Sequence, residues 1–104
     1  SDMEYIVKEL LHPEEDDEAR YVYSELDSER KETRRVEFYP GGVCFAYGGD
    51  MGHDEVLDPT PFPAELRTLN RPGECEVRSI SRQMFLEVWG QAQERPDGFM
   101  GMFF

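Results

Sequence analysis

Two stretches of the chain, Arg20–Asp27 and Arg34–Pro40, alternate apolar and polar side chains with a period of two residues. This is the period of a β-strand, in which successive side chains point to opposite faces of a sheet. In the first stretch, Tyr21, Tyr23 and Glu25 would share one face. The polar segment between the two stretches, residues 28–33, predicts a hairpin. Two neighbouring antiparallel strands are therefore the starting point for the fold.

Turn residues divide the rest of the first half of the chain. Glu4–His12 is rich in β-branched and aromatic residues at its start and is followed by a proline, which predicts another strand. Pro40–Gly42 predicts a tight turn, and Val43–Tyr47 would be the strand that follows it. Residues 48–63 have no periodicity and predict an irregular surface connection. Glu74–Ile80 fits either an edge strand or an extended lead-in.

The second half of the chain contains one strong helical signal. Residues 82–94 carry an apolar stripe with helical spacing, and Ser79 or Ser81 would cap the start of that helix. Ala64–Asn70 predicts a short helix with Pro63 at its first position. The stripe consists of Phe85, Val88, Trp89 and Ala92.

These elements predict an α+β domain: a four- to five-stranded antiparallel sheet with one main C-terminal helix packed on one face. A chain of 104 residues has room for one domain, residues 1–104. Ser1 and Asp2 would be a cloning remnant before a native start at Met3. Residues 96–104 form an apolar tail. Its last part, residues 99–104, would either fold onto the core or bind a partner.

The charge balance is strongly acidic, with 23 Asp and Glu against 11 Lys and Arg and a formal net charge of −12. Binding to nucleic acid is not expected, because affinity for phosphate backbones depends on Lys and Arg. Binding to an anionic membrane surface is disfavoured for the same reason. An acidic surface instead favours a cationic protein partner, although net charge also serves solubility alone.

Cys44 and Cys75 are too far apart in the sequence for a thiolate metal motif, and two buried, reduced thiols are expected. The sequence contains no apolar run long enough to span a bilayer and no basic segment followed by an apolar one at its start. We therefore expect a soluble, cytoplasmic protein.

The glycine-rich stretch Gly48–Glu55 raises the question of a phosphate-binding or metal-binding site. It lacks the glycine spacing of phosphate-binding loops, and its aspartates would repel phosphate. Asp50, His53, Asp54 and Glu55 are of metal-ligand type, but their spacing matches no EF-hand, and a solvated acidic loop is the preferred interpretation. We expect no cofactor and no metal, and keep a small-ligand or metal site in this stretch as an alternative.

No set of residues suggests a catalytic mechanism. A nucleophile would need one of the two histidines, His12 or His53, and Cys44 sits between apolar neighbours, as a buried cysteine does. None of the usual catalytic constellations is assembled, so we expect a protein that is not an enzyme.

Four segments together resemble a family of small bacterial domains of unknown function: "YIVKELLH", "YSELD", "RRVEFYPGGVCFAY" and "ISRQMFLEVW". The resemblance covers Tyr5 to Trp89 and rests on core and turn residues, so it implies a fold rather than an activity. The acidic insertion "EEDDE", residues 14–18, and the segment "RPDGFMGMFF" lie outside it. In general type, such small acidic domains also resemble the immunity proteins of bacterial toxin systems.

The expected function is therefore that of an immunity-type inhibitor that docks on a basic protein toxin, such as a nuclease. Its acidic side chains would mimic phosphates, and tyrosines would anchor the interface. A structural or regulatory module with no ligand is a further alternative. The expected partner-binding residues are Glu14, Glu15, Asp16, Asp17, Glu18, Tyr21, Tyr23, Tyr39, Asp50, Asp54 and Glu55.

Overall fold

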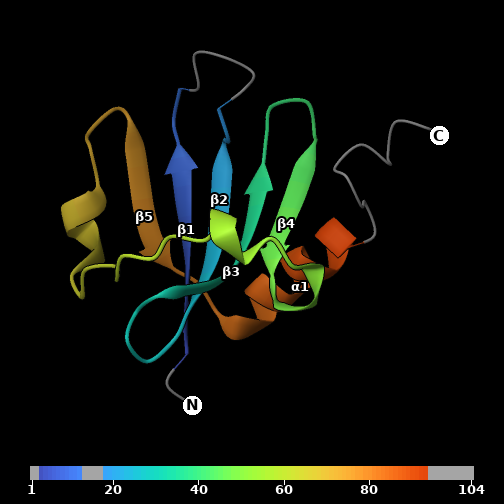
Figure 1. Cartoon of the computed structure of the whole chain (residues 1–104). Helices are drawn as coiled ribbons and strands as arrows, with labels where there is room; N and C mark the ends of the chain where they lie inside the picture. Colours follow the sequence, from blue (N-terminus) through green and yellow to red (C-terminus); the bar gives the residue numbers. More distant parts are fainter. Residues whose placement is uncertain (1–2, 13–17, 94–104) are drawn as a thin grey trace.

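A computed structural model describes residues 3–12 and 18–93. It contains a five-stranded antiparallel sheet with one α-helix on one side and a long connection across the other side (Figure 1). The predicted α+β class is confirmed. The elements are β1 (Glu4–Leu10), β2 (Tyr21–Leu26), β3 (Glu32–Phe38), β4 (Cys44–Gly48), β5 (Cys75–Ser79) and α1 (Arg82–Gln93).

The strand order is β4-β3-β2-β1-β5. The first four strands along the chain are also neighbours in the sheet, because a hairpin joins each strand to the next. β5 pairs with β1 at the opposite edge from β4, with Ile6 facing Ser79 and Leu10 facing Cys75. The chain must therefore cross the whole sheet between β4 and β5.

The strand predictions hold with small shifts of boundary. Ser24 and Leu26 lie on the face opposite Tyr23, as the alternation requires. β3 begins at Glu32, two residues before the predicted Arg34, because the register shifts between Glu25 and Leu26 and lets the pairing continue. The open choice for residues 74–80 is resolved as a strand.

Helix α1 packs its predicted stripe on the sheet. Phe85, Val88, Trp89 and Ala92 are buried, together with Tyr5, Val36 and Cys44 from the strands. The backbone N–H of Met84 donates to Oγ of Ser81 at 3.0 Å, which identifies Ser81 as the N-cap. The sequence predicts a helix that extends one residue further, to residue 94, followed by the apolar segment 99–104. Residue 94 and this segment lie outside the described residues, which end at Gln93.

The other side of the sheet is covered in part by the β4–β5 connection. This connection contains three short 3-10 helices: η1 (Gly49–Met51), η2 (Asp54–Val56) and η3 (Leu66–Leu69). Phe62, Leu66 and Leu69 pack on a second apolar cluster of Ile6, Leu26 and Val77. Residues 48–63 are therefore not purely a surface loop, because their end covers part of the sheet.

The predicted short helix at Ala64–Asn70 was wrong in type and length. The structure has four residues of 3-10 helix, and Glu65 before them has an extended backbone. Asn70 is fixed by its side chain, which accepts a 2.7 Å hydrogen bond from the N–H of Val77, and Arg71 forms a β-bridge with Cys75. The chain must turn back towards β5 here, which leaves no room for an α-helix.

The connection is also tied to the sheet through the β2–β3 hairpin. The Arg30 guanidinium donates to the carbonyls of Phe62 at 3.1 Å and Pro63 at 2.9 Å, and it forms an ion pair with Glu4. The N–H of Phe62 in turn donates to the carbonyl of Arg30 at 2.8 Å. These bonds fix where the connection enters the face of the sheet.

Other local predictions are confirmed. Gly41 and Gly42 both have positive φ, and the N–H of Gly42 donates to the carbonyl of Tyr39, as expected for a hairpin turn. Cys44 and Cys75 are both buried, and they do not form a disulfide with each other. None of the helices in the described ranges is long and apolar enough to cross a membrane.

Candidate functional site

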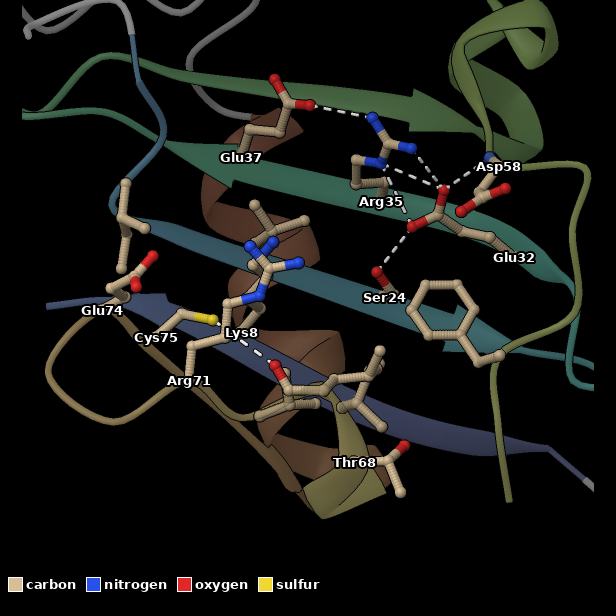
Figure 2. Close-up of a pocket in the computed structure, with 16 residues that line it drawn as sticks. Lys8, Ser24, Glu32, Arg35, Glu37, Asp58, Thr68, Arg71, Glu74 and Cys75 are labelled. Atoms are coloured by element: carbon tan, nitrogen blue, oxygen red, sulfur yellow. Dashed lines mark hydrogen bonds and ion pairs between the residues drawn. The ribbon is translucent and has the colours of Figure 1, made fainter. Parts of the chain in front are cut away.

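The side of the sheet opposite α1 contains a pocket of about 520 Å³ (Figure 2). Its floor is the central part of the sheet, and its wall is the β4–β5 connection at Asp58, Phe62 and Leu69. This volume lies within the range of about 300–1,000 Å³ that is usual for sites of small ligands.

The strand register places the floor residues in rows. One row crosses the sheet from Glu37 through Val22 to Lys8 and Val77. The next row contains Arg35, Ser24 and Ile6. Because directly opposed residues lie about 5 Å apart, each row joins charged and apolar side chains within a short distance.

Glu32 is the most deeply buried charged group of this face, with 1% of its side chain exposed. Its carboxylate accepts hydrogen bonds from Oγ of Ser24 at 2.6 Å, from the Arg35 guanidinium at 2.7 Å and from the N–H of Asp58 at 2.9 Å. Each partner comes from a different segment: β2, β3 and the connection. A buried carboxylate is tolerable only when it is paired in this way.

Arg35 bridges Glu32 and a second carboxylate, Glu37, which its Nη1 contacts at 3.0 Å. Burial alone would lower the pKa of Arg35, but the bonds to both carboxylates raise it above its usual value. Glu37 also accepts a 2.8 Å hydrogen bond from the Tyr39 hydroxyl. Burial and this bond raise the pKa of Tyr39 to about 12.

The opposite end of the pocket carries charges of a different kind. Lys8, Arg71 and Glu74 lie there with Cys75, away from the Glu32–Arg35 network (Figure 2). Lys8 and Arg71 are both exposed and form no ion pair with another residue in the described ranges. Among the described residues, the pocket thus has a paired ionic wall with one carboxylate in excess at one end and two cations without an ion pair at the other.

The buried charges on the helix side have a structural role. Glu25 and Arg34 face each other across β2 and β3, and the guanidinium donates two hydrogen bonds to the carboxylate, at 2.8 and 2.7 Å. The same guanidinium lies over the ring of Trp89 in α1, 4.8 Å from its centroid. This pair links the sheet to the helix and lies outside the pocket.

The predicted partner-binding residues that the structure describes do not form one surface. Glu14, Glu15, Asp16 and Asp17 lie outside the described residues. Glu18 precedes β2, whereas Asp50, Asp54 and Glu55 follow β4, and the register places the start of β2 and the end of β4 at opposite ends of the sheet. The two ends of a six-residue strand lie about 20 Å apart, and this is the approximate separation between Glu18 and the acidic residues after β4.

The predicted tyrosine anchors are also divided. Tyr21 and Tyr23 contact each other on the helix side, with ring centroids 6.3 Å apart. Tyr39 contacts Phe45, with their ring centroids 5.7 Å apart, and its bond to Glu37 places it on the pocket side. All three are only partly buried, so each presents some surface to solvent.

The loop Gly48–Glu55 is separate from the pocket, since none of its residues lines it. His53 and Glu55 approach each other at 3.6 Å, and both side chains are largely exposed. No group of three His, Cys, Asp or Glu residues among residues 3–12 and 18–93 is placed to hold a metal ion.

Sequence reasoning missed the residues that form the pocket. Arg35 and Glu37 had a usable signal, because opposite charges two residues apart lie on one face of a strand, whereas Glu32 joins that face only through the register shift between Glu25 and Leu26. Lys8 and Arg71 had none, since their proximity depends on β5 pairing with β1 and on the bridge between Arg71 and Cys75.

Comparison with known families gives one result for this fold. Residues 4–94 match the model of a domain of unknown function, DUF6881. The chain belongs to the DUF6881 family. The match spans every strand and the described helix, so it confirms that the chain is a member of a family of domains without an assigned function. No curated protein and no solved structure matches this DUF6881 chain.

Proposed function

We propose that this DUF6881 domain is a non-enzymatic protein-binding domain, most concretely an immunity-type inhibitor of a basic toxin. The observation that carries the proposal is the loop after β4, where Asp50, Asp54 and Glu55 are all exposed. None of the three forms an ion pair with a lysine or arginine of the described residues. Their charges are available to a cationic partner.

The loop is ordered by its own backbone. The N–H of Gly48 donates to the carbonyl of Gly52 at 2.7 Å, and the N–H of Leu57 donates to the carbonyl of Asp54 at 3.1 Å. At its base, Gly48 leaves no space for a side chain, because a Cβ would lie 2.4 Å from the carbonyl oxygen of Thr33. A loop that is fixed before binding loses less conformational entropy when it docks.

The net charge of −12 supports the same proposal through association kinetics. An excess of one sign steers a partner of the opposite sign, and complementary potentials raise association rates and specificity. The acidic loop would then be the point of contact, and the rest of the acidic surface would guide the encounter.

A binding role is also favoured over catalysis by the way the charged groups are used. The carboxylates with the best partners, Glu25 and Glu32, hold strands, helix and connection together. Neither is left free at a pocket in the manner of a general acid or base. The buried thiols Cys44 and Cys75 are similarly packed in the two sides of the sheet.

The test is affinity capture from the native host with the full chain, at low and at moderate salt. A retained protein should be basic, and after purification it should bind the chain in calorimetry. The variant Asp50→Asn/Asp54→Asn/Glu55→Gln should weaken that binding at least tenfold, and higher salt should weaken it further.

The matched control is Glu65→Gln/Glu76→Gln/Glu87→Gln, which removes the same charge from exposed positions outside the loop. It should weaken the affinity much less than the loop variant does, and only through a slower association rate. If no basic protein is retained, or if both triple variants weaken binding equally, the proposal for this loop is wrong. An immunity role further requires that the chain protects cells that express the retained protein.

A further inference from the structure

The pocket opposite α1 suggests a second binding function, independent of the acidic loop. From its charges and shape we infer that it is a site for a small organic anion with a single negative charge and an apolar body. The free cations Lys8 and Arg71 would hold the anionic group, and the apolar floor would hold the body of the ligand.

The first step concerns the cations. The other basic residues that the structure describes either form ion pairs or lie away from the pocket: Arg20 lies over the ring of Tyr21, and Arg82 borders a different hollow. Within residues 3–12 and 18–93, Lys8 and Arg71 are therefore cations without an ion pair that line one cavity, in a chain with a large acidic excess. The paired ones are Arg30, Lys31, Arg34, Arg35, Arg67 and Arg78.

The second step concerns the charge at this end of the pocket. Glu74 is the nearby carboxylate that also lines it, and it forms no ion pair with either cation. Glu18 borders a neighbouring hollow that Lys8 shares. Counting only the groups that line this end of the pocket itself, Lys8 and Arg71 against Glu74 leave one positive charge, which matches a monoanion. A planar guanidinium and a mobile ammonium are suited to grip a carboxylate together.

The third step concerns the floor. Val22 lies between Lys8 and Glu37 in the strand register, and Leu10, Val77 and Cys75 line the cavity on β1 and β5, on the same side as Lys8. At the far end Arg35 is already paired with both Glu32 and Glu37, so this wall has one carboxylate in excess and disfavours an anionic group. An apolar group would therefore fill the middle of the pocket, while the anionic group remains at the exposed mouth beside Lys8 and Arg71.

The experiment is a titration of the isotope-labelled full chain with phenylacetate and with octanoate, followed by amide chemical shifts. The neutral amides of both acids are the ligand controls. Both acids should shift residues of the pocket, including Val22, Leu10 and Cys75, and the amides should bind at least tenfold more weakly. Failure of both acids to shift these residues at millimolar concentration would overturn the inference.

The variant Lys8→Gln/Arg71→Gln should weaken binding of the acids at least tenfold. Both side chains are exposed, so the fold should persist, and an unchanged thermal midpoint would confirm it. Arg67→Gln/Arg82→Gln is the control, because it removes the same charge at exposed sites outside the pocket. Equal losses in both variants would mean that net charge alone attracts the anions, which would also refute the site.

Discussion

Glu25 and Arg34 face each other across β2 and β3, and the Arg34 guanidinium is held between the carboxylate of Glu25 and the ring of Trp89. One residue of β3 thus joins its neighbouring strand to the helix that covers the sheet. The aromatic ring of Phe85 lies under the same guanidinium, with 5.2 Å from Cζ to the ring centroid. The charge of Arg34 is therefore satisfied on both sides, by the carboxylate and by the aromatic faces.

Glu25→Gln should destabilise the fold in a pH-dependent manner. Burial alone raises the pKa of Glu25, but the hydrogen bonds from Arg34 and Thr33 outweigh it and lower the pKa below its usual value. A lowered pKa stabilises the folded state above the unfolded value of 4.5, and this contribution is lost as the pH falls through the folded value. We expect a loss of about 2 kcal/mol in the free energy of unfolding at neutral pH, the size of a hydrogen bond to a charged group.

Urea denaturation of both proteins at neutral pH and at about pH 3 checks this expectation, since the difference between them should shrink in acid. Glu9→Gln is the control, because Glu9 forms a longer, more exposed ion pair with Arg78 at 3.5 Å. A Glu25→Gln effect that does not depend on pH would contradict the assignment.

Glu32→Gln should cost more than removal of a surface charge. The amide cannot accept the bonds from Ser24, Arg35 and Asp58 equally well, and it leaves Arg35 with one carboxylate. Because Arg35 keeps its ion pair with Glu37, we expect the free energy of unfolding to fall by about 3 kcal/mol, the lower end of the range for a broken buried ion pair. Glu65→Gln, which removes the exposed pair with Arg67, should cost less than about 1 kcal/mol.

Both values come from chemical denaturation. Since Asp58 belongs to the connection, Glu32→Gln should also speed hydrogen exchange at the Asp58 amide. Equal costs for the two variants would show that the Glu32 network does not stabilise the fold.

Gly48→Ala and Gly41→Ala should separate steric exclusion from backbone preference. Both glycines have φ near +90°, so both substitutions carry a backbone penalty of about 1–2 kcal/mol. A Cβ at Gly48 would also meet the carbonyl oxygen of Thr33 at 2.4 Å, whereas a Cβ at Gly41 would meet nothing within 4 Å. Thermal denaturation should therefore show a clearly larger loss for Gly48→Ala. Similar losses would rule out the close approach of β4 to β3.

Tyr39 should remain protonated at a pH where an ordinary tyrosine ionises. Burial and the bond to Glu37 raise its pKa from 10.0 to about 12. Because the neutral phenol is favoured in the folded state, this contribution is present below pH 10.0 and is lost as the pH rises through about 12. Tyr39→Phe should cost about 1 kcal/mol at neutral pH through the lost hydrogen bond.

The difference in phenolate absorbance between the parent protein and Tyr39→Phe isolates the ionisation of this residue. The difference should still be small at about pH 11. A midpoint near 10 would contradict the bond between Tyr39 and Glu37.

The sequence by itself determined the elements that local spacing encodes. The alternation around Tyr21 and Tyr23, the glycines at Gly41 and Gly42, and the stripe from Phe85 to Ala92 each specify structure within one turn or one strand. These signals depend on the geometry of a strand, a turn and a helix, and so they hold without knowledge of the rest of the chain. They were sufficient for the α+β class.

The tertiary structure alone decided the sheet order and the pocket. β5 pairs with β1, so Leu10 lies opposite Cys75 although the two residues are far apart in the sequence. No local pattern encodes that pairing. The crossing from β4 to β5 then becomes obligatory, which covers one end of the open face and leaves a cavity at the other. Lys8 and Arg71 share that cavity because long-range backbone pairing, rather than residue spacing, sets the distance between strands.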